Sequence, residues 1–119
     1  MRHFKTFLSL FLVAAFLAGC AISTHVANIR QRPARFQDRS VTVEGRVTDL
    51  WSVPLVPMKF YRVDDGTGDI VVVSNSSRVP RRGDQVRVTG RVESVGAFGG
   101  QSVGLHLEQE HLSISGYGR

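Results

Sequence analysis

The fold is decided by residues 61–73, which read Tyr-Arg-Val-Asp-Asp-Gly-Thr-Gly-Asp-Ile-Val-Val-Val. Hydrophobic and polar residues alternate at the start, turn-forming residues follow at positions 65–68, and a β-branched run completes the stretch. This order predicts a β-hairpin over about residues 58–75, around which the other strands wrap. Asp64 and Asp65 are expected to accept hydrogen bonds from turn amides rather than to form a catalytic carboxylate pair.

Three further segments show the alternation of strands with one buried face. In residues 41–48 and 86–93 every second residue is predicted to face inward, and these residues are valines except for Gly45 and Gly90. The two glycines lie at matching places, where a bulge or sharp coil is expected. A last strand is predicted to begin at Val103. Together with the hairpin these segments give five strands, and their closure into a small barrel would leave no strand edge exposed.

The beginning of the chain carries the pattern of an export signal. A basic start is followed by an apolar run over residues 7–17, which is shorter than the about 20 residues that a membrane-spanning helix needs. The run ends in Leu17-Ala18-Gly19-Cys20, which resembles the lipobox of bacterial lipoproteins. The resemblance implies removal of the preceding peptide and acylation of Cys20. The alternatives are an ordinary signal peptide and a short membrane anchor with an incidental cysteine.

The single cysteine and the residue that follows it, Ala21, support the interpretation as a lipoprotein. Cys20 is the only cysteine, so no intramolecular disulfide can form. Lipidation gives a lone exported cysteine a role, since two or more acyl chains anchor a protein stably. Ala21 follows the cysteine, and resemblance to the enterobacterial sorting rule implies the outer membrane. We therefore expect a protein of the bacterial cell envelope, anchored by lipid at Cys20 and facing the periplasm.

Three parts are predicted: a signal peptide over residues 1–19, a lipidated N-terminus with a short helix and linker over 20–40, and a barrel over 41–115. After removal of Arg2 and Lys5 the chain holds 13 Lys+Arg (15 minus 2) against 10 Asp+Glu, a net charge of +3. Dedicated nucleic-acid binders are more basic than this. The helical region carries arginines that form either a basic collar facing anionic lipids or a solvated helix face. They are Arg30, Arg32, Arg35 and Arg39.

Three motifs together resemble the oligonucleotide/oligosaccharide-binding (OB) fold. They are Val41-Thr-Val-Glu-Gly-Arg-Val, residues 61–72 with their Asp-Gly-Thr-Gly turn, and Gly83-Asp-Gln-Val-Arg-Val-Thr-Gly-Arg-Val. The leading helix and residues 33–39 are similar to the bacterial OB-fold family of small exported stress-related proteins. The resemblance covers residues 26 to about 112 and implies an all-β, five-stranded Greek-key barrel with a short N-terminal helix.

One departure from the OB pattern concerns the helix that usually joins strands three and four. Here that connection is only the polar loop over residues 76–83. Val26, Ile29 and Phe36 from the N-terminal segment are therefore expected to close that end of the barrel.

The resemblance implies a binding face on the outside of strands two and three, flanked by the loops after strands one and four. Alternation places Tyr61, Val63, Ile70 and Val72 inside the barrel. Arginines interleaved with aromatic rings can stack on bases or sugars and hold anionic groups. Alternatively, the apolar members lie under the helix or contact a protein. The candidate ligand-binding residues are Arg46, Trp51, Phe60, Arg62, Val71, Val73 and Phe98.

Catalytic and metal-binding signals are weak. The sequence contains no Gly-x-Ser-x-Gly, His-Glu-x-x-His or Walker motif, so we expect neither an enzyme nor a cofactor. His106, Glu108 and Glu110 share one strand face and are of types that ligate zinc. The alternative, which we favour, is cross-strand ion pairing with Arg87 or Arg91, and no metal is expected.

Three functions are compatible with these features. The first is a non-catalytic, lipid-anchored binding module for an anionic envelope glycan, a lipid headgroup or an envelope protein. The second is a domain that binds single-stranded nucleic acid, the best-known use of the fold, although nucleic acid is scarce outside the cytoplasm. The third is a structural or stress-related envelope lipoprotein. A fold by itself does not decide among them.

Overall fold

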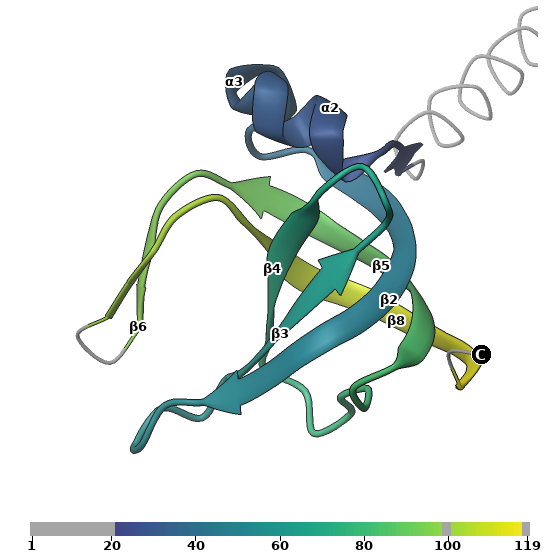
Figure 1. Cartoon of the computed structure of the whole chain (residues 1–119). Coiled ribbons are helices and arrows are strands. Elements are labelled where there is room, and N and C mark those ends of the chain that lie inside the picture. Colours follow the sequence, from purple (N-terminus) through teal and green to yellow (C-terminus); the bar gives the residue numbers. More distant parts are fainter. Residues whose placement is uncertain (1–20, 99–100, 118–119) are drawn as a thin grey trace, which may run out of the picture.

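The computed structural model describes residues 21–98 and 101–117 (Figure 1). Its centre is a six-stranded sheet, and a two-stranded hairpin extends from it. Two short helices, α2 (Val26–Gln31) and α3 (Pro33–Phe36), lie before the long strands. The strands are β1 (Ile22–Ser23), β2 (Ser40–Ser52), β3 (Lys59–Asp64), β4 (Asp69–Ser74), β5 (Asp84–Glu93), β6 (Gly96–Phe98), β7 (Gln101–Val103) and β8 (His106–Tyr117).

The sheet closes on itself. Its order is β1-β2-β3-β4-β8-β5, and an additional pairing between β2 and β5 completes the ring. β2 can serve both neighbours because its 13 residues pair first with β5 and then with β3. The parallel pair β4–β8 joins the two halves. The prediction of a five-stranded OB-type barrel is confirmed, and the two-residue β1 adds a parallel edge beside β2.

The inner face follows the predicted alternation. Tyr61, Val63, Ile70 and Val72 all belong to the buried core. The Tyr61 hydroxyl donates a hydrogen bond to Oε1 of Gln109, which satisfies the polar end of a ring that has no exposed surface. Burial raises the pKa of Tyr61 well above its ordinary value, because the phenolate would lose its hydration.

The helices close one end of the barrel, as predicted. Val26 and Ile29 are fully buried and Phe36 is 9% exposed, and all three join the core. Figure 1 shows α2 and α3 covering the end of the barrel beside the β3–β4 turn. The segment forms two helices rather than the single one expected, because Pro33 occupies the first position of α3, where its fixed φ starts a new helix.

The β3–β4 turn holds the start of α2. The N-cap residue His25 supplies no side-chain cap. Instead, Asp65 Oδ2 accepts a hydrogen bond from the Val26 amide at 2.9 Å, and Thr67 Oγ1 accepts one from the Ala27 amide at 3.1 Å. Asp65 also accepts a hydrogen bond from the Thr67 amide, and Asp64 accepts one from the Gly66 amide, as expected for the two turn aspartates. The turn therefore ties the helices to the barrel.

Two local expectations need correction. The bulge considered at Gly45 lies further along β2, where the pairing shifts register between Val47 and Asp49. At Gly45 the backbone of β3 passes too close for any side chain, and a sharp coil there stays a prediction. The register shift at Thr89/Gly90 matches the expected irregularity. The last strand begins at His106 rather than Val103, because Val103 belongs to β7 and pairs with Gly96 of β6.

The predicted membrane attachment concerns residues at the start of the chain. In residues 21–98 and 101–117 no helix combines the length and hydrophobicity needed to cross a bilayer. The predicted signal peptide and Cys20 lie outside the residues that the structure describes.

Candidate binding face

The candidate binding face lies on the outer side of β3, β4 and the last residues of β2; we call it the binding face and define it as Trp51, Phe60, Arg62, Val71 and Val73. None of the five is part of the core cluster, so their outward orientation agrees with the predicted alternation. The β2–β3 connection and the β6–β7 hairpin both extend from the same side of the barrel, at the left of Figure 1. These two connections are the ones expected to flank an OB binding face.

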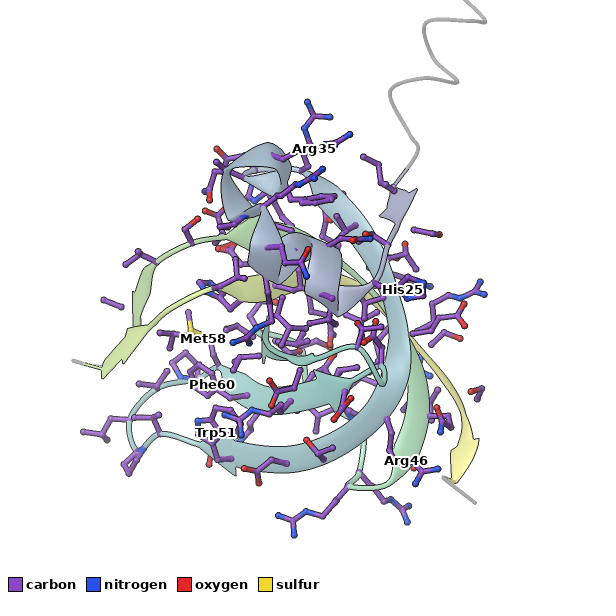
Figure 2. The ribbon with its side chains drawn as sticks, turned by 45° about the horizontal axis from the view of Figure 1, so that its top comes forward. His25, Arg35, Arg46, Trp51, Met58 and Phe60 are labelled. Atoms are coloured by element: carbon purple, nitrogen blue, oxygen red, sulfur yellow. The ribbon has the colours of Figure 1, made fainter. Side chains whose placement is uncertain are left out.

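Strand register brings the aromatic members together. Trp51 lies opposite Phe60, and Phe60 lies opposite Val73. The rings of Trp51 and Phe60 stack, with centroids 5.8 Å apart and planes 11° apart. The Arg62 guanidinium carbon lies 5.6 Å from the Trp51 ring centroid, which is cation–π distance. Figure 2 shows Trp51 and Phe60 side by side with Met58 nearby.

Exposure divides the face into contact residues and support. Phe60 is 1% exposed and Val73 is 6% exposed, so neither can contact a ligand without movement of its neighbours. Trp51 and Arg62 remain partly exposed, and 40% of the Arg62 side chain is accessible. A ligand would therefore meet Trp51 and Arg62, while Phe60 and Val73 fix their position from below.

Asp69 orients Arg62 and connects the face to the helices. Its Oδ2 lies 3.6 Å from Arg62 Nε. Arg30 of α2 donates a hydrogen bond to the Asp69 carbonyl at 2.8 Å, and its guanidinium lies 3.5 Å from Oδ1. Each of these exposed pairs contributes at most about 1 kcal/mol. An anionic ligand could therefore replace Asp69 as the partner of Arg62 with a loss of at most about 1 kcal/mol.

A pocket of about 280 Å³ adjoins the face at Val73. Its charge is mixed, because Arg91 lies 3.1 Å from a carboxylate oxygen of Glu93 and of Glu108. The neighbouring carboxylates raise the pKa of Arg91, with the Glu108 hydrogen bond the largest cause. The lining residues are Met58, Val73, Asn75, Arg91, Glu108, Gln109 and Glu110.

The three residues considered for metal binding have other roles in the structure. His106 is buried, and its Nδ1 lies 2.7 Å from the Gly104 carbonyl oxygen. Glu108 pairs with Arg91, as the sequence indicated, and Glu110 accepts a hydrogen bond from Ser40 at 2.6 Å. Over the described ranges, no three His, Cys, Asp or Glu side chains are grouped to hold an ion.

Two of the predicted ligand-binding residues, Arg46 and Phe98, are not part of the binding face defined above. Arg46 is in register with Asp64, at the opposite end of β3 from Phe60, which corresponds to about 13 Å along the strand. Figure 2 likewise shows Arg46 away from Trp51. Phe98 belongs to β6, and its side chain is not among those described.

The sequence interpretation missed Asp69 and Met58. Asp69 has the same strand parity as Val71, which was a signal for its place on the outer side. No comparable pattern marked Met58, whose position depends on the path of the β2–β3 connection.

Comparisons with known proteins return only structural likenesses, since no protein-family model and no curated protein match the sequence. An asparaginyl-tRNA synthetase from Pyrococcus horikoshii is similar over 79% of this chain, with a TM-score of 0.60 and 18% identity. An aspartyl-tRNA synthetase from Entamoeba histolytica is similar over 75%, with a TM-score of 0.56 and 13% identity. This chain spans only 23% and 21% of the lengths of those two proteins.

A third similar structure is a smaller protein. OBody AM3L09, solved bound to hen egg-white lysozyme, matches 70% of this chain and is itself covered over 87% of its length. Its TM-score is 0.54 at 20% identity. At such identities the three likenesses establish the fold alone: this chain is an OB-fold domain with two short N-terminal helices.

Proposed function

We propose that this protein is a lipid-anchored, periplasm-facing OB module that binds an anionic ligand of the cell envelope without catalysing a reaction. The observation that carries the proposal is the cluster of Trp51 and Arg62 on the outer side of the barrel, supported from below by Phe60. An indole face and a guanidinium side by side suit a ligand that combines a ring with a negative charge, such as a glycan carrying carboxylate or phosphate groups.

Ligand binding can be followed through Trp51, because it is the only tryptophan in the chain. We expect a uronic-acid or phosphorylated oligosaccharide to change the Trp51 fluorescence saturably at low salt. Arg62→Ala should weaken this binding about five-fold or more, since a hydrogen-bonded charge contributes about 1–3 kcal/mol. Arg87→Ala is the matched control, because Arg87 is equally cationic but pairs with Glu44 on the other side of β2. Equal effects of the two substitutions would contradict the proposed face.

The same titration tests the nucleic-acid alternative. The stacked rings of Trp51 and Phe60 beside Arg62 form the kind of surface on which single-stranded bases stack. Binding of an oligothymidylate with a steep salt dependence, lost in Arg62→Ala, would favour this alternative over a glycan. No binding of the oligonucleotide at low salt would exclude it.

A protein partner is the second candidate, and the β2–β3 connection favours it. Leu55 at the tip of this connection is fully exposed at 105%, with a φ of 68° that non-glycine residues rarely adopt. Pro54 and Pro57 flank it and restrict the backbone. Such a rigid apolar tip suits an apolar recess of a protein, and OBody AM3L09 is an OB-fold protein solved with a protein partner. Co-purification of the lipidated chain with envelope proteins, lost in Leu55→Asp, would support this candidate.

Anchoring is tested separately at Cys20. We expect Cys20→Ala to release the protein from the membrane fraction of a bacterial cell, because the substitution removes the thiol that takes the acyl chain. The measurement is fractionation followed by immunoblotting, with Ser23→Ala as a control close to the same site. Retention of Cys20→Ala in the membrane fraction after a high-salt wash would refute lipidation there.

A further inference from the structure

We propose that the surface of α2 and α3 rests on an anionic phospholipid surface and holds the binding face away from the membrane. We call this surface the arginine collar and define it as Arg32, Arg35 and Arg39. The inference deepens the proposed anchoring at Cys20 and rests on it for its biological setting. Its physical content, attraction of the collar to anionic headgroups, can be tested without lipidation.

The collar is exposed cationic surface. Its three side chains are exposed, and within the described part of the chain none of them forms an ion pair. Arg30 differs, because Asp69 already partners it. Figure 2 shows Arg35 projecting from the helices away from the barrel. Residues 21–40 hold four arginines and one acidic residue, Asp38, so this segment carries a net charge of +3 (4 minus 1).

The position of the collar in the chain brings it to the membrane. Val26, the first residue of α2, is six positions after Cys20. Six extended residues span at most about 20 Å, so an acyl chain at Cys20 would keep the helices next to the headgroups. At physiological ionic strength, charges act over about 8 Å. An arginine near an anionic membrane surface typically strengthens binding about five-fold.

The fold then determines which way the binding face points. α2 lies on the β3–β4 turn through the hydrogen bonds of Asp65 and Thr67. Trp51 and Phe60 pair near the opposite end of β3 from that turn. Figure 1 shows the helices at one end of the barrel and the β2–β3 connection at the other. A membrane under the helices therefore leaves Trp51 and Arg62 open toward the periplasm.

The experiment uses the chain from residue 20 with Cys20→Ser, which cannot be acylated and retains every helix and strand described. Binding is measured by co-sedimentation with vesicles of phosphatidylcholine alone, or of phosphatidylcholine with one third phosphatidylglycerol. We expect binding to the anionic vesicles only, weakened as sodium chloride is raised. Replacing the collar arginines together by glutamine should weaken this binding at least ten-fold.

The matched control removes the same number of charges at the other end of the barrel. The β4–β5 connection contains Arg78, Arg81 and Arg82. It is held to β2 by a hydrogen bond from the Gly83 amide to the Val47 carbonyl and by the ion pair of Arg82 with Asp49. Their replacement by glutamine should leave vesicle binding within about two-fold, with both variants first checked for an unchanged thermal transition. Equal losses in the two variants, or no binding of the unaltered chain at low salt, would overturn the inference. Retention of Cys20→Ala on cell membranes after a high-salt wash, which removes protein held by charge alone, would refute the anchor and leave the vesicle result standing.

Discussion

Replacing Gly45 by valine should lower the free energy of unfolding by about 3 kcal/mol, a large share of the stability of a small domain. A Cβ atom at position 45 would lie 2.4 Å from the carbonyl oxygen of Asp64 and 2.8 Å from its carbonyl carbon. Both atoms are backbone, so no side chain can rotate away. β2 is also paired with β5 at this point, through Gly45 and Val86, and cannot retreat. Urea denaturation followed by circular dichroism measures the change.

Gly104→Val is the matched control. A Cβ atom at Gly104 has no neighbour within 4 Å, so we expect a change within about 0.5 kcal/mol. Gly90→Ala should also be costly, because its Cβ would lie 2.8 Å from the Glu108 carbonyl oxygen. If Gly45→Val were as stable as Gly104→Val, the claim that the β3 backbone excludes a side chain at position 45 would be contradicted.

The ring and its interior could be predicted because they depend on local pattern. A period of two assigns each strand residue to one face, so Tyr61 and Val72 were correctly placed inside without knowledge of their partners. The same holds for Val26 and Ile29, whose helical spacing marks one apolar side. Closure of the ring follows from the need of valine-rich strands to bury their edges.

The binding face was only partly predictable because it depends on contacts between distant segments. Strand parity places Phe60 outward, but not the Trp51 ring that stacks on it. Arg46 also has outward parity, yet the register of β2 with β3 places it beside Asp64 at the other end. Gly45 similarly indicates that a side chain is excluded, but only the β3 backbone shows what excludes it.

Asp65→Ala should destabilise the protein by about 3 kcal/mol, because it removes the partly buried hydrogen bond that ties the first residue of α2 to the β3–β4 turn. The carboxylate is 3% exposed and accepts hydrogen bonds from the amides of Val26 and Thr67. Each hydrogen bond to a charged group contributes about 1.5–3 kcal/mol, and loss of Asp65 leaves the Val26 amide with no cap. α2 has six residues, too few to be stable without its attachment. Thermal unfolding and the far-ultraviolet circular dichroism of the variant measure the effect.

The contribution of Asp65 should depend on pH. Burial acts to raise its pKa, but the hydrogen bonds from Thr67 and Val26, with the nearby His25, together lower it below the ordinary 3.8. The folded state therefore favours the charged carboxylate. The resulting stability is fully present above pH 3.8 and is lost as the pH falls below that value, through the lower pKa of the folded state. The stability difference between the unaltered protein and Asp65→Asn should thus shrink below pH 3.8.

Asp64→Asn is the control that distinguishes the stability contributed by the Asp65 carboxylate from the effect of removing any negative charge from the β3–β4 turn. Asp64 is the preceding residue, is exposed, and accepts a hydrogen bond within the turn, from the Gly66 amide at 2.7 Å. We expect its substitution to cost no more than about 1 kcal/mol, because water can replace the lost contact. Equal costs for the two asparagine variants at neutral pH would mean that the turn is stabilised by its own geometry. In that case the link from Asp65 to Val26 would not be what holds the helices on the barrel.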